Sequence, residues 1–210
     1  MVRVLVADDH AVVRRGLRQM FEASSDIEVA GEAATGSEVL SHVERGSYDA
    51  VLLDISMPGR NGLEVLKQIR AMAPGLPVII FSMHPGEDYA VRCLKAGAAA
   101  YLTKDSAAEE ILAAVRRVAR GGRYLNPALL DKLPLGWESR QDEPQHARLS
   151  DREFEVMCLC ARGMTTAQIA EELSLSAQTI STYKTRILEK MKLPSFAHVI
   201  RYAVEHGLVP

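Results

Sequence analysis

Carboxylates, a hydroxyl and a lysine follow successive apolar runs in the first half of the chain. Asp8 and Asp9 end the first run, Asp54 ends a later one, and Ser82 and Lys104 follow two more. Two carboxylates about 4 Å apart repel by roughly 4 kcal/mol at an effective dielectric near 20, so gathered acids call for a cation. Oxygen ligands with room for water suit Mg²⁺. A metal beside a free carboxylate, a lysine and a hydroxyl would support phosphoryl transfer to Asp54.

Each of these residues, taken alone, has an ordinary structural explanation. Asp8 or Asp9 could cap the helix that follows, and Lys104 could be a solvated surface charge. What favours the phosphoryl-transfer site is position, because each required group occurs once, after its own apolar run.

The elements that must position these groups are short strands alternating with helices. Five β-rich runs alternate with amphipathic stretches up to about residue 123, at residues 2–7, 27–30, 50–53, 77–81 and 99–102. Runs such as AVLL and PVIIF lack polar alternation, which is typical of strands buried on both faces of a parallel sheet. Thr35 with Glu38 and Ser106 with Glu109 fit helix capping boxes. The pattern predicts an α/β fold, a (βα)5 doubly wound parallel sheet whose carboxyl edge carries the site.

The VLLDISMPGRNG segment around Asp54 resembles the phosphoacceptor segment of receiver domains in two-component response regulators. The resemblance covers about 120 residues. It implies that Asp9, Asp54 and the main-chain carbonyl of Ser56 bind Mg²⁺ directly and that Asp8 acts through water. It also implies that Lys104 and Ser82 contact the phosphoryl group and that Tyr101 is the switch aromatic, although a strand tyrosine is more often a packing residue. Asp105 departs from the family, where proline is common.

Beyond about residue 121 the pattern changes to a linker and then to helices only. Residues 121–147 contain Pro127, Pro134 and Pro144, which interrupt a continuous helix but allow one short helical turn. Trp137 could dock on a domain surface or be an ordinary linker aromatic. After a Ser150/Glu153 capping box, helical patterns cover residues 151–161, 166–173, 177–191 and 196–206. We therefore expect domains at 1–120 and 148–210, joined by the linker at 121–147.

The second and third of these helices fit a helix-turn-helix. The apolar positions suited to its packing are Ile169, Ala170, Leu173, Leu175, Ile180 and Tyr183. Ser174 begins the turn where many such motifs use glycine, and Ser176 caps the second helix. An ordinary αα-hairpin shares this pattern, but charge favours DNA binding. Residues 176–192 carry four basic residues against one acid, a net charge of +3, within a chain whose formal charge is −2.

Residues 149–193 resemble the four-helix DNA-binding domain of the LuxR/NarL class. The resemblance implies a helix whose DNA-binding set is Thr179, Ser181, Thr182, Lys184, Thr185, Arg186 and Lys190. Ser181, Thr182 and Thr185 would face base edges, with the three cations nearer phosphates. Ser181 and Tyr183 stand where members commonly have lysine and histidine. Hydroxyls discriminate bases less sharply than bidentate Arg or Asn, so the DNA sequence is not specified.

Composition agrees with a two-domain regulator and excludes other classes. The three cysteines do not suit a zinc site or a disulfide framework, since Cys158 and Cys160 point to different faces of a helix. No segment suits a membrane span or signal peptide, so we expect a cytoplasmic protein. The resemblances imply a bacterial transcriptional regulator of the NarL/FixJ type. Its expected partners are a sensor histidine kinase, double-stranded DNA and a second copy when phosphorylated, with RNA polymerase as a further candidate.

Two rival functions use the same residues. A phosphoaspartyl hydrolase also needs an aspartate nucleophile, Mg²⁺ and a lysine, but such enzymes usually carry a substrate-enclosing cap, and no insertion here is long enough. A receiver with a protein-binding helical output would need no DNA. We therefore expect a regulator rather than an enzyme, taking part only in its own phosphorylation and autodephosphorylation.

Overall fold

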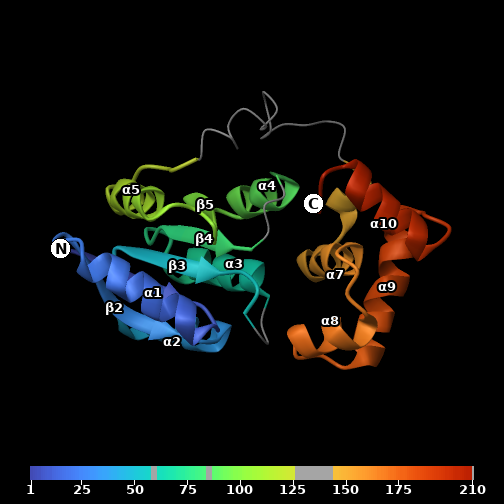
Figure 1. The fold of residues 1–210 in the computed structure, drawn as a ribbon, viewed down its shortest axis with the longest axis horizontal. Helices are drawn as coiled ribbons and strands as arrows, with labels where there is room; N and C mark the ends of the chain where they lie inside the picture. Colours follow the sequence, from blue (N-terminus) through green and yellow to red (C-terminus); the bar gives the residue numbers. More distant parts are fainter. Residues whose placement is uncertain (58–60, 84–86, 126–143, 210) are drawn as a thin grey trace. The chain divides into compact units, whose positions relative to one another are not determined.

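The chain forms two compact units, one built on a parallel sheet and one built from helices (Figure 1). The computed structural model describes residues 1–57, 61–83, 87–125 and 144–209. Within these residues, no helix has the length and apolar character needed to cross a membrane. Most of the expected linker, with Trp137, Pro127 and Pro134, lies outside the described residues.

The sheet is the predicted doubly wound one. Its parallel strands are β1 (Val2–Ala7), β2 (Ile27–Ala33), β3 (Ala50–Asp54), β4 (Val78–Ser82) and β5 (Ala100–Thr103), in the order β2-β1-β3-β4-β5. The order reverses between β1 and β3, and ligands of such sheets bind outside the carboxyl ends of the strands at this switch point. The residues that follow β1 and β3 therefore lie where a ligand would bind.

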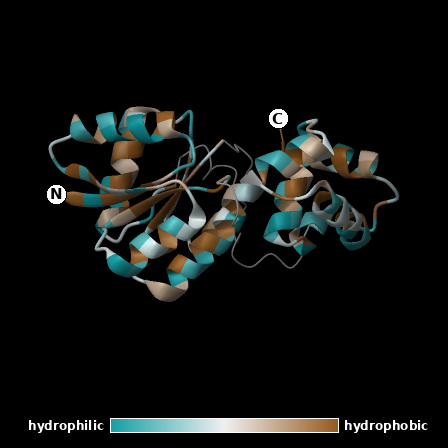
Figure 2. Ribbon diagram, turned by 90° about the horizontal axis from the view of Figure 1, so that it is seen from below, coloured by the Kyte–Doolittle hydropathy of each residue, from teal (hydrophilic) through white to brown (hydrophobic). Residues whose placement is uncertain are grey.

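Helices cover both faces of the sheet. They are α1 (Ala11–Glu22), α2 (Gly36–Arg45), α3 (Gly62–Met72), α4 (Glu87–Lys95) and α5 (Ala108–Ala119). Leu17 and Phe21 of α1 and Val115 of α5 pack with Val6 and Leu52 of the strands in one apolar core. Figure 2 shows the matching pattern, with hydrophobic strands and helices that are hydrophobic on one side. Leu5 and Leu53, which point to the other face of the sheet, are also fully buried, so both faces hold the strand ends that carry the polar groups.

One predicted helix start is wrong. Ser106 does not cap α5, because the helix begins one residue later, after Ala107, whose side chain cannot accept a hydrogen bond. The Ser106 hydroxyl instead lies 3.4 Å from the hydroxyl of Thr103. At Thr35 the N-cap half of the predicted box is confirmed, since the Thr35 side chain accepts a hydrogen bond from the main-chain N–H of Glu38. The Glu38 carboxylate accepts from the N–H of Ala34 at 2.7 Å instead of from that of Thr35.

The C-terminal unit follows the predicted helical pattern closely. A 3-10 turn, η1 (Gln145–Arg148), precedes α7 (Asp151–Ala161), α8 (Thr166–Glu172), α9 (Ala177–Met191) and α10 (Phe196–Glu205). The capping box of Ser150 and Glu153 is present at the start of α7, and Ser176 caps α9. The predicted ends of α7 and α9 are confirmed, and those of α8 and α10 differ by one residue.

The turn between α8 and α9 explains the position of Ser174. Ser174 has φ of 52°, a left-handed conformation that glycine adopts more easily. Its N–H donates to the carbonyl of Glu171, and the N–H of Leu175 donates to the carbonyl of Ala170, at 3.1 and 2.8 Å. These bonds form a Schellman motif that ends α8 and redirects the chain into α9.

Candidate functional site

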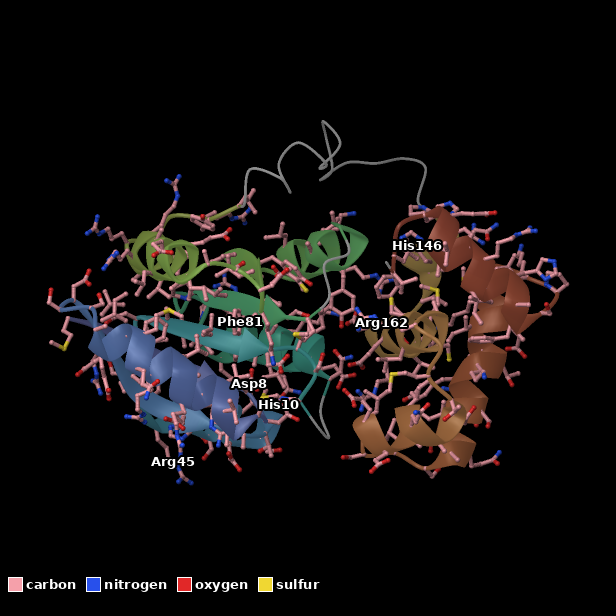
Figure 3. The ribbon with its side chains drawn as sticks, viewed as in Figure 1. Asp8, His10, Arg45, Phe81, His146 and Arg162 are labelled. Carbon is pink, nitrogen blue, oxygen red and sulfur yellow. The ribbon has the colours of Figure 1, made fainter. Side chains whose placement is uncertain are left out.

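Acidic residues gather at the carboxyl ends of β1 and β3. Asp8 and Asp54 are each 1% exposed, and the Asp9 side chain is 29% exposed. Figure 3 labels Asp8 and His10 together at this end of β1. The pairing of Ala7 with Leu53 in the β1–β3 register brings the next residues, Asp8 and Asp54, side by side. Asp8 and Asp54 thus meet at the carboxyl edge of the sheet, where residues that follow parallel strands were expected to converge.

Lys104 lies between the two buried carboxylates. Its ammonium nitrogen is 2.6 Å from Oδ2 of Asp54 and 2.6 Å from Oδ2 of Asp8. The Lys104 side chain is only 9% exposed, which excludes the solvated surface charge. One cation thus partly neutralises two acids that would otherwise repel each other.

Main-chain groups orient the carboxylates. The N–H of Ser56 donates to Oδ1 of Asp54 at 2.9 Å, and the N–H of His10 donates to Oδ1 of Asp8 at 2.8 Å. His10, not an aspartate, is the N-cap residue of α1, and its side chain makes no cap hydrogen bond. The helix-cap alternative for Asp8 and Asp9 is therefore wrong, because neither occupies that position.

Gly62 lies directly against the main chain of Ile55, the residue that follows Asp54. A Cβ atom at this position would lie 2.4 Å from Cα and 2.7 Å from the carbonyl oxygen of Ile55. Real Cβ atoms do not approach main-chain atoms so closely, and the main chain of Ile55 cannot move aside as a flexible side chain can. The N–H of Gly62 donates to that same carbonyl at 3.3 Å. The glycine thus keeps α3 close to the residues after Asp54.

The donor set suits a divalent cation. One ligand atom from each of Asp8, Asp9, His10 and Asp54 can be chosen so that all lie within 4.8 Å of one another. Three of the four groups are carboxylates, which suit Mg²⁺. His10 is a neighbour that the sequence-based set omitted; its Nδ1 lies 2.7 Å from Oδ1 of Asp9. Its position directly after the paired aspartates was the available signal.

Burial and charge act in opposite directions on the ionisable groups. Burial raises the pKa of Asp54, and the adjacent Lys104 ammonium opposes that rise. Burial by itself would lower the pKa of Lys104, but the charge of Asp54 and hydrogen bonds to Asp54 and Asp8 more than offset it, so the pKa is raised. Lys104 therefore stays positively charged at neutral pH.

Ser82 and Tyr101 occupy the adjoining strands and are both buried, at 0% and 4% exposed. Ser82 ends β4 opposite Thr103 of β5 in the strand register. The N–H of Lys104 donates to the main-chain carbonyl of Ser82 at 2.9 Å. A direct main-chain hydrogen bond thus joins Ser82, the predicted hydroxyl donor, to Lys104.

In the second unit, α9 exposes the residues that were predicted to face bases. Ser181, Thr182 and Thr185 are exposed, whereas Thr179 is half-buried. The Thr179 hydroxyl lies 2.8 Å from that of Ser176, within the helix cap. Three of the four hydroxyl residues are therefore available to a ligand, and Thr179 is partly engaged in capping.

Two of the three cations predicted near phosphates have partners within the same unit. The Lys184 ammonium lies 4.6 Å from the centre of the Phe196 ring. The Lys190 ammonium donates to Oε2 of Glu153 at 2.6 Å. Arg186 is exposed, and no ion pair of it is found among the described residues. Within the part of the chain that the structure describes, Arg186 is thus the one of the three with no ion pair or ring contact.

Two family models match the chain. Residues 4–116 match the response regulator receiver domain, and residues 147–203 match the bacterial regulatory proteins of the luxR family. These ranges correspond to the sheet unit and to the helices α7–α10.

Known proteins resemble the chain over nearly its whole length. It is 33% identical to the response regulator UvrY of Escherichia coli (strain K12) over 209 residues, 99% of this chain and 96% of that protein. It is 33% identical to the response regulator GacA of Pseudomonas aeruginosa over 210 residues, 100% of this chain and 98% of GacA. A similar solved structure is that of RcsB from Salmonella enterica serovar Typhimurium bound to promoter rprA in the presence of the phosphomimetic BeF3−. Its sequence is 25% identical and its TM-score is 0.66, and the match covers 97% of this chain and 99% of the RcsB chain.

Proposed function

This chain belongs to the response regulators that join a receiver domain to a LuxR-family domain, and we propose from this premise that phosphorylation of Asp54 controls its binding to DNA. The observation that carries the proposal is the buried group of Asp8, Asp54 and Lys104, with Lys104 at 2.6 Å from both carboxylates. The full-length similarity to UvrY and GacA supports a role in transcription.

The chemistry proposed for Asp54 is nucleophilic attack on the phosphorus of a phosphohistidine in a sensor kinase. As the new bond between a carboxylate oxygen and phosphorus forms, the phosphorus–nitrogen bond breaks and its electron pair leaves with the histidine nitrogen. The charged Lys104 can shift from the Asp54 carboxylate to an oxygen of the transferred group. Ser82, at the end of the neighbouring strand, would donate its hydroxyl to the same group. Their attraction to the added charge stabilises the phosphorylated form.

We assign the Mg²⁺ site to Asp9, Asp54 and the main-chain carbonyl of Ser56, with Asp8 acting through water. The bound ion would neutralise charge that develops on the phosphoryl oxygens. The carboxylates of this chain supply the ligands, and the N–H of Ser56 keeps one oxygen of Asp54 fixed. Loss of the phosphate by hydrolysis at the same pocket is proposed as the only other chemistry of the chain.

The proposed output is a change in domain arrangement or dimerisation. Phosphorylation adds about −1.5 to −2 charge and new acceptor oxygens, which Lys104 and Ser82 bind better in one conformation than in another. Tyr101 of β5, three residues before Lys104, would follow their movement. A dimer would bring two copies of α9 to half-sites one helical turn apart and thus add their contacts to DNA.

We propose domain limits of 1–120 and 148–210, with residues 121–147 as the linker and the cytoplasm as the place of action. A sensor histidine kinase, promoter DNA and a second copy of the chain are the proposed partners, and RNA polymerase is a further one. The DNA contacts proposed for α9 are Thr179, Ser181, Thr182, Lys184, Thr185, Arg186 and Lys190. The exposure of Ser181, Thr182, Thr185 and Arg186 supports them most directly.

The test is Asp54→Asn, with Asp105→Asn as the matched control. Asp105 is exposed and follows Lys104 directly, so its substitution changes the charge nearby without removing the nucleophile. With acetyl phosphate and Mg²⁺, Asp54→Asn should show no retarded species on Phos-tag gels, while Asp105→Asn should be labelled as the natural chain is. Undiminished labelling of Asp54→Asn would contradict the assignment.

A further inference from the structure

Four polar residues form one exposed face of α9. Gln178, Ser181, Thr182 and Thr185 are all exposed and follow the i, i+3, i+4, i+7 spacing of a single helix face. The opposite side of the helix is buried, as at Ile187. We refer to these four residues as the hydroxyl face. Gln178 was not among the DNA-binding residues predicted from the sequence, although it lies at the N-terminal end of α9, where recognition helices contact bases.

The three hydroxyls of this face already use their hydrogens. Each donates to the main-chain carbonyl oxygen four residues earlier, at 3.0 Å for Ser181, 3.0 Å for Thr182 and 3.2 Å for Thr185. A hydroxyl has one hydrogen to donate and two lone pairs to accept with. Toward a ligand, these side chains therefore present acceptors, and donation would first require breaking an intrahelical bond.

Donors are scarce on the same face. Lys184 lies over the Phe196 ring and Lys190 donates to Glu153. Arg186, four residues after Thr182, is exposed at the edge of the face and is a cationic donor there. Glu189 is exposed one turn beyond Thr185 and is a further acceptor. Within the hydroxyl face, the amide of Gln178 is the one side chain that offers N–H donors as well as an acceptor.

This distribution matches some base edges and not others. In the major groove, guanine presents only acceptors, whereas adenine and cytosine each carry an exocyclic amino group that donates. A glutamine amide can bond adenine at both N6 and N7. The γ-methyl groups of Thr182 and Thr185 suit contact with the 5-methyl group of thymine.

We propose that the hydroxyl face of α9 reads exocyclic amino groups in the major groove and that Gln178 is a specificity-determining residue that bonds one adenine. Ser181, Thr182 and Thr185 accept hydrogen bonds from amino groups of adenine or cytosine at neighbouring positions. Arg186, at the side of the face, contacts phosphate. The inference rests on the proposed DNA binding and adds to it the chemistry by which a sequence is chosen.

The experiment begins with selection of binding sites from random DNA, using the full chain treated with acetyl phosphate and Mg²⁺. The enriched duplex is then scanned, one position at a time, with base analogues. Purine in place of adenine and 2-pyrimidinone in place of cytosine remove the amino group, whereas 7-deazaadenine removes N7. Affinities are measured for the natural chain, Gln178→Ala and Thr182→Val, with Arg186→Ala as the control.

At one adenine, loss of either N6 or N7 should weaken DNA binding by the natural chain by about threefold to tenfold, the change in affinity that one lost hydrogen bond usually causes. The same analogues should not weaken DNA binding by Gln178→Ala further. At another position, loss of the amino group should weaken the natural chain but not Thr182→Val. Arg186→Ala should bind all these duplexes more weakly by a constant factor and show a smaller salt dependence.

Two outcomes would overturn the inference while leaving DNA binding intact. One is that Gln178→Ala keeps every base preference of the natural chain. The other is that Thr182→Val loses a preference for a base acceptor, such as N7 of guanine, which would make the hydroxyl a donor. Failure to enrich any sequence would instead contradict the proposed function and this inference with it.

Discussion

Replacement of Glu153 by glutamine tests how strongly α7 is held to α9. Glu153 is buried, and its Oε2 accepts hydrogen bonds from the Ser150 N–H at 2.7 Å and from the Lys190 ammonium at 2.6 Å. Glutamine keeps an oxygen that can accept the Ser150 bond, so the helix cap survives. It removes the negative charge that holds Lys190.

The size of the effect follows from the exposure of the two partners. Hydrogen bonds to charged groups contribute about 1.5–3 kcal/mol, whereas exposed ion pairs contribute about 0–1 kcal/mol. The Glu153 side chain is 3% exposed and that of Lys190 is 41% exposed, so solvent screens one partner but not the other. We therefore expect Glu153→Gln to lower the free energy of unfolding of the C-terminal unit by about 1–2 kcal/mol.

Hydrogen–deuterium exchange of α7 and α9 in the full chain measures this loss. The expected change corresponds to exchange faster by about fivefold to thirtyfold at pH 7 for the most protected amides. The control is Arg201→Gln, which removes an ion pair with Glu205 at 3.5 Å whose side chains are 70% and 58% exposed. Its exchange should rise about twofold or less. Equal exchange in Glu153→Gln and the natural chain at pH 7 would refute the reasoning.

The hydrogen-bonded pair of Glu153 and Lys190 also makes the stability of the C-terminal unit depend on pH. Burial would raise the pKa of Glu153, but hydrogen bonds from Lys190 and from Ser150 outweigh it, so the pKa is lowered in the folded protein. A carboxylate with a lowered folded pKa stabilises the fold above its unfolded pKa and loses that contribution as the pH falls through the folded value. The difference between the natural chain and Glu153→Gln should thus persist at pH 6 and shrink below about pH 4.3.

Three further changes test other parts of the molecule. Gly62→Ala places a Cβ atom 2.4 Å from Cα of Ile55, so it should destabilise the receiver by about 3 kcal/mol or more, visible as a lower thermal midpoint; an unchanged midpoint would contradict the close approach. Lys104→Met leaves two buried carboxylates without their cation, so in EDTA the receiver should be less stable than in the natural chain. Mg²⁺ should then raise the thermal midpoint of the variant more than that of the natural chain, and a smaller rise would argue against the metal site. Lys184→Ala should weaken DNA binding to all sequences and lower the salt slope by about one in fluorescence anisotropy, and an unchanged slope would mean that Lys184 stays on the Phe196 ring when DNA is bound.

Most of the receiver could be predicted because the strand pattern is strong. Parallel strands buried on both faces appear as unbroken apolar runs, and the polar residues that follow them must meet at one edge. The positions of Asp8, Asp54 and Lys104 followed from that rule. The start of α5 did not, because the pattern at Ser106 and Glu109 fits a capping box, whereas the Ser106 hydroxyl lies near Thr103 and the helix starts one residue later.

The partners of the charged side chains in the second unit could not be predicted. Capping residues located the starts of α7 and α9, and α9 also buries an apolar stripe at Ile180, Ile187 and Met191. Neither signal could show that Lys190 reaches Glu153, 37 residues earlier, or that Lys184 lies over Phe196. Such contacts depend on how helices cross, and a net charge of +3 for residues 176–192 does not say which cations are free. Gln178 was overlooked for the related reason that it carries no charge.

The hydrogen bond between the Lys104 N–H and the Ser82 carbonyl joins the end of β4 to the residue that follows β5. If the Ser82 hydroxyl is drawn toward a phosphoryl group on Asp54, this hydrogen bond would transmit the displacement of Ser82 to the segment that carries Lys104. In the proposed phosphorylated form, movements of Ser82 and Lys104 would thus be coupled, and Tyr101 lies on the strand that ends just before Lys104. The strength of this one inter-strand hydrogen bond would then determine how closely the position of Lys104 follows that of Ser82 when Asp54 is phosphorylated.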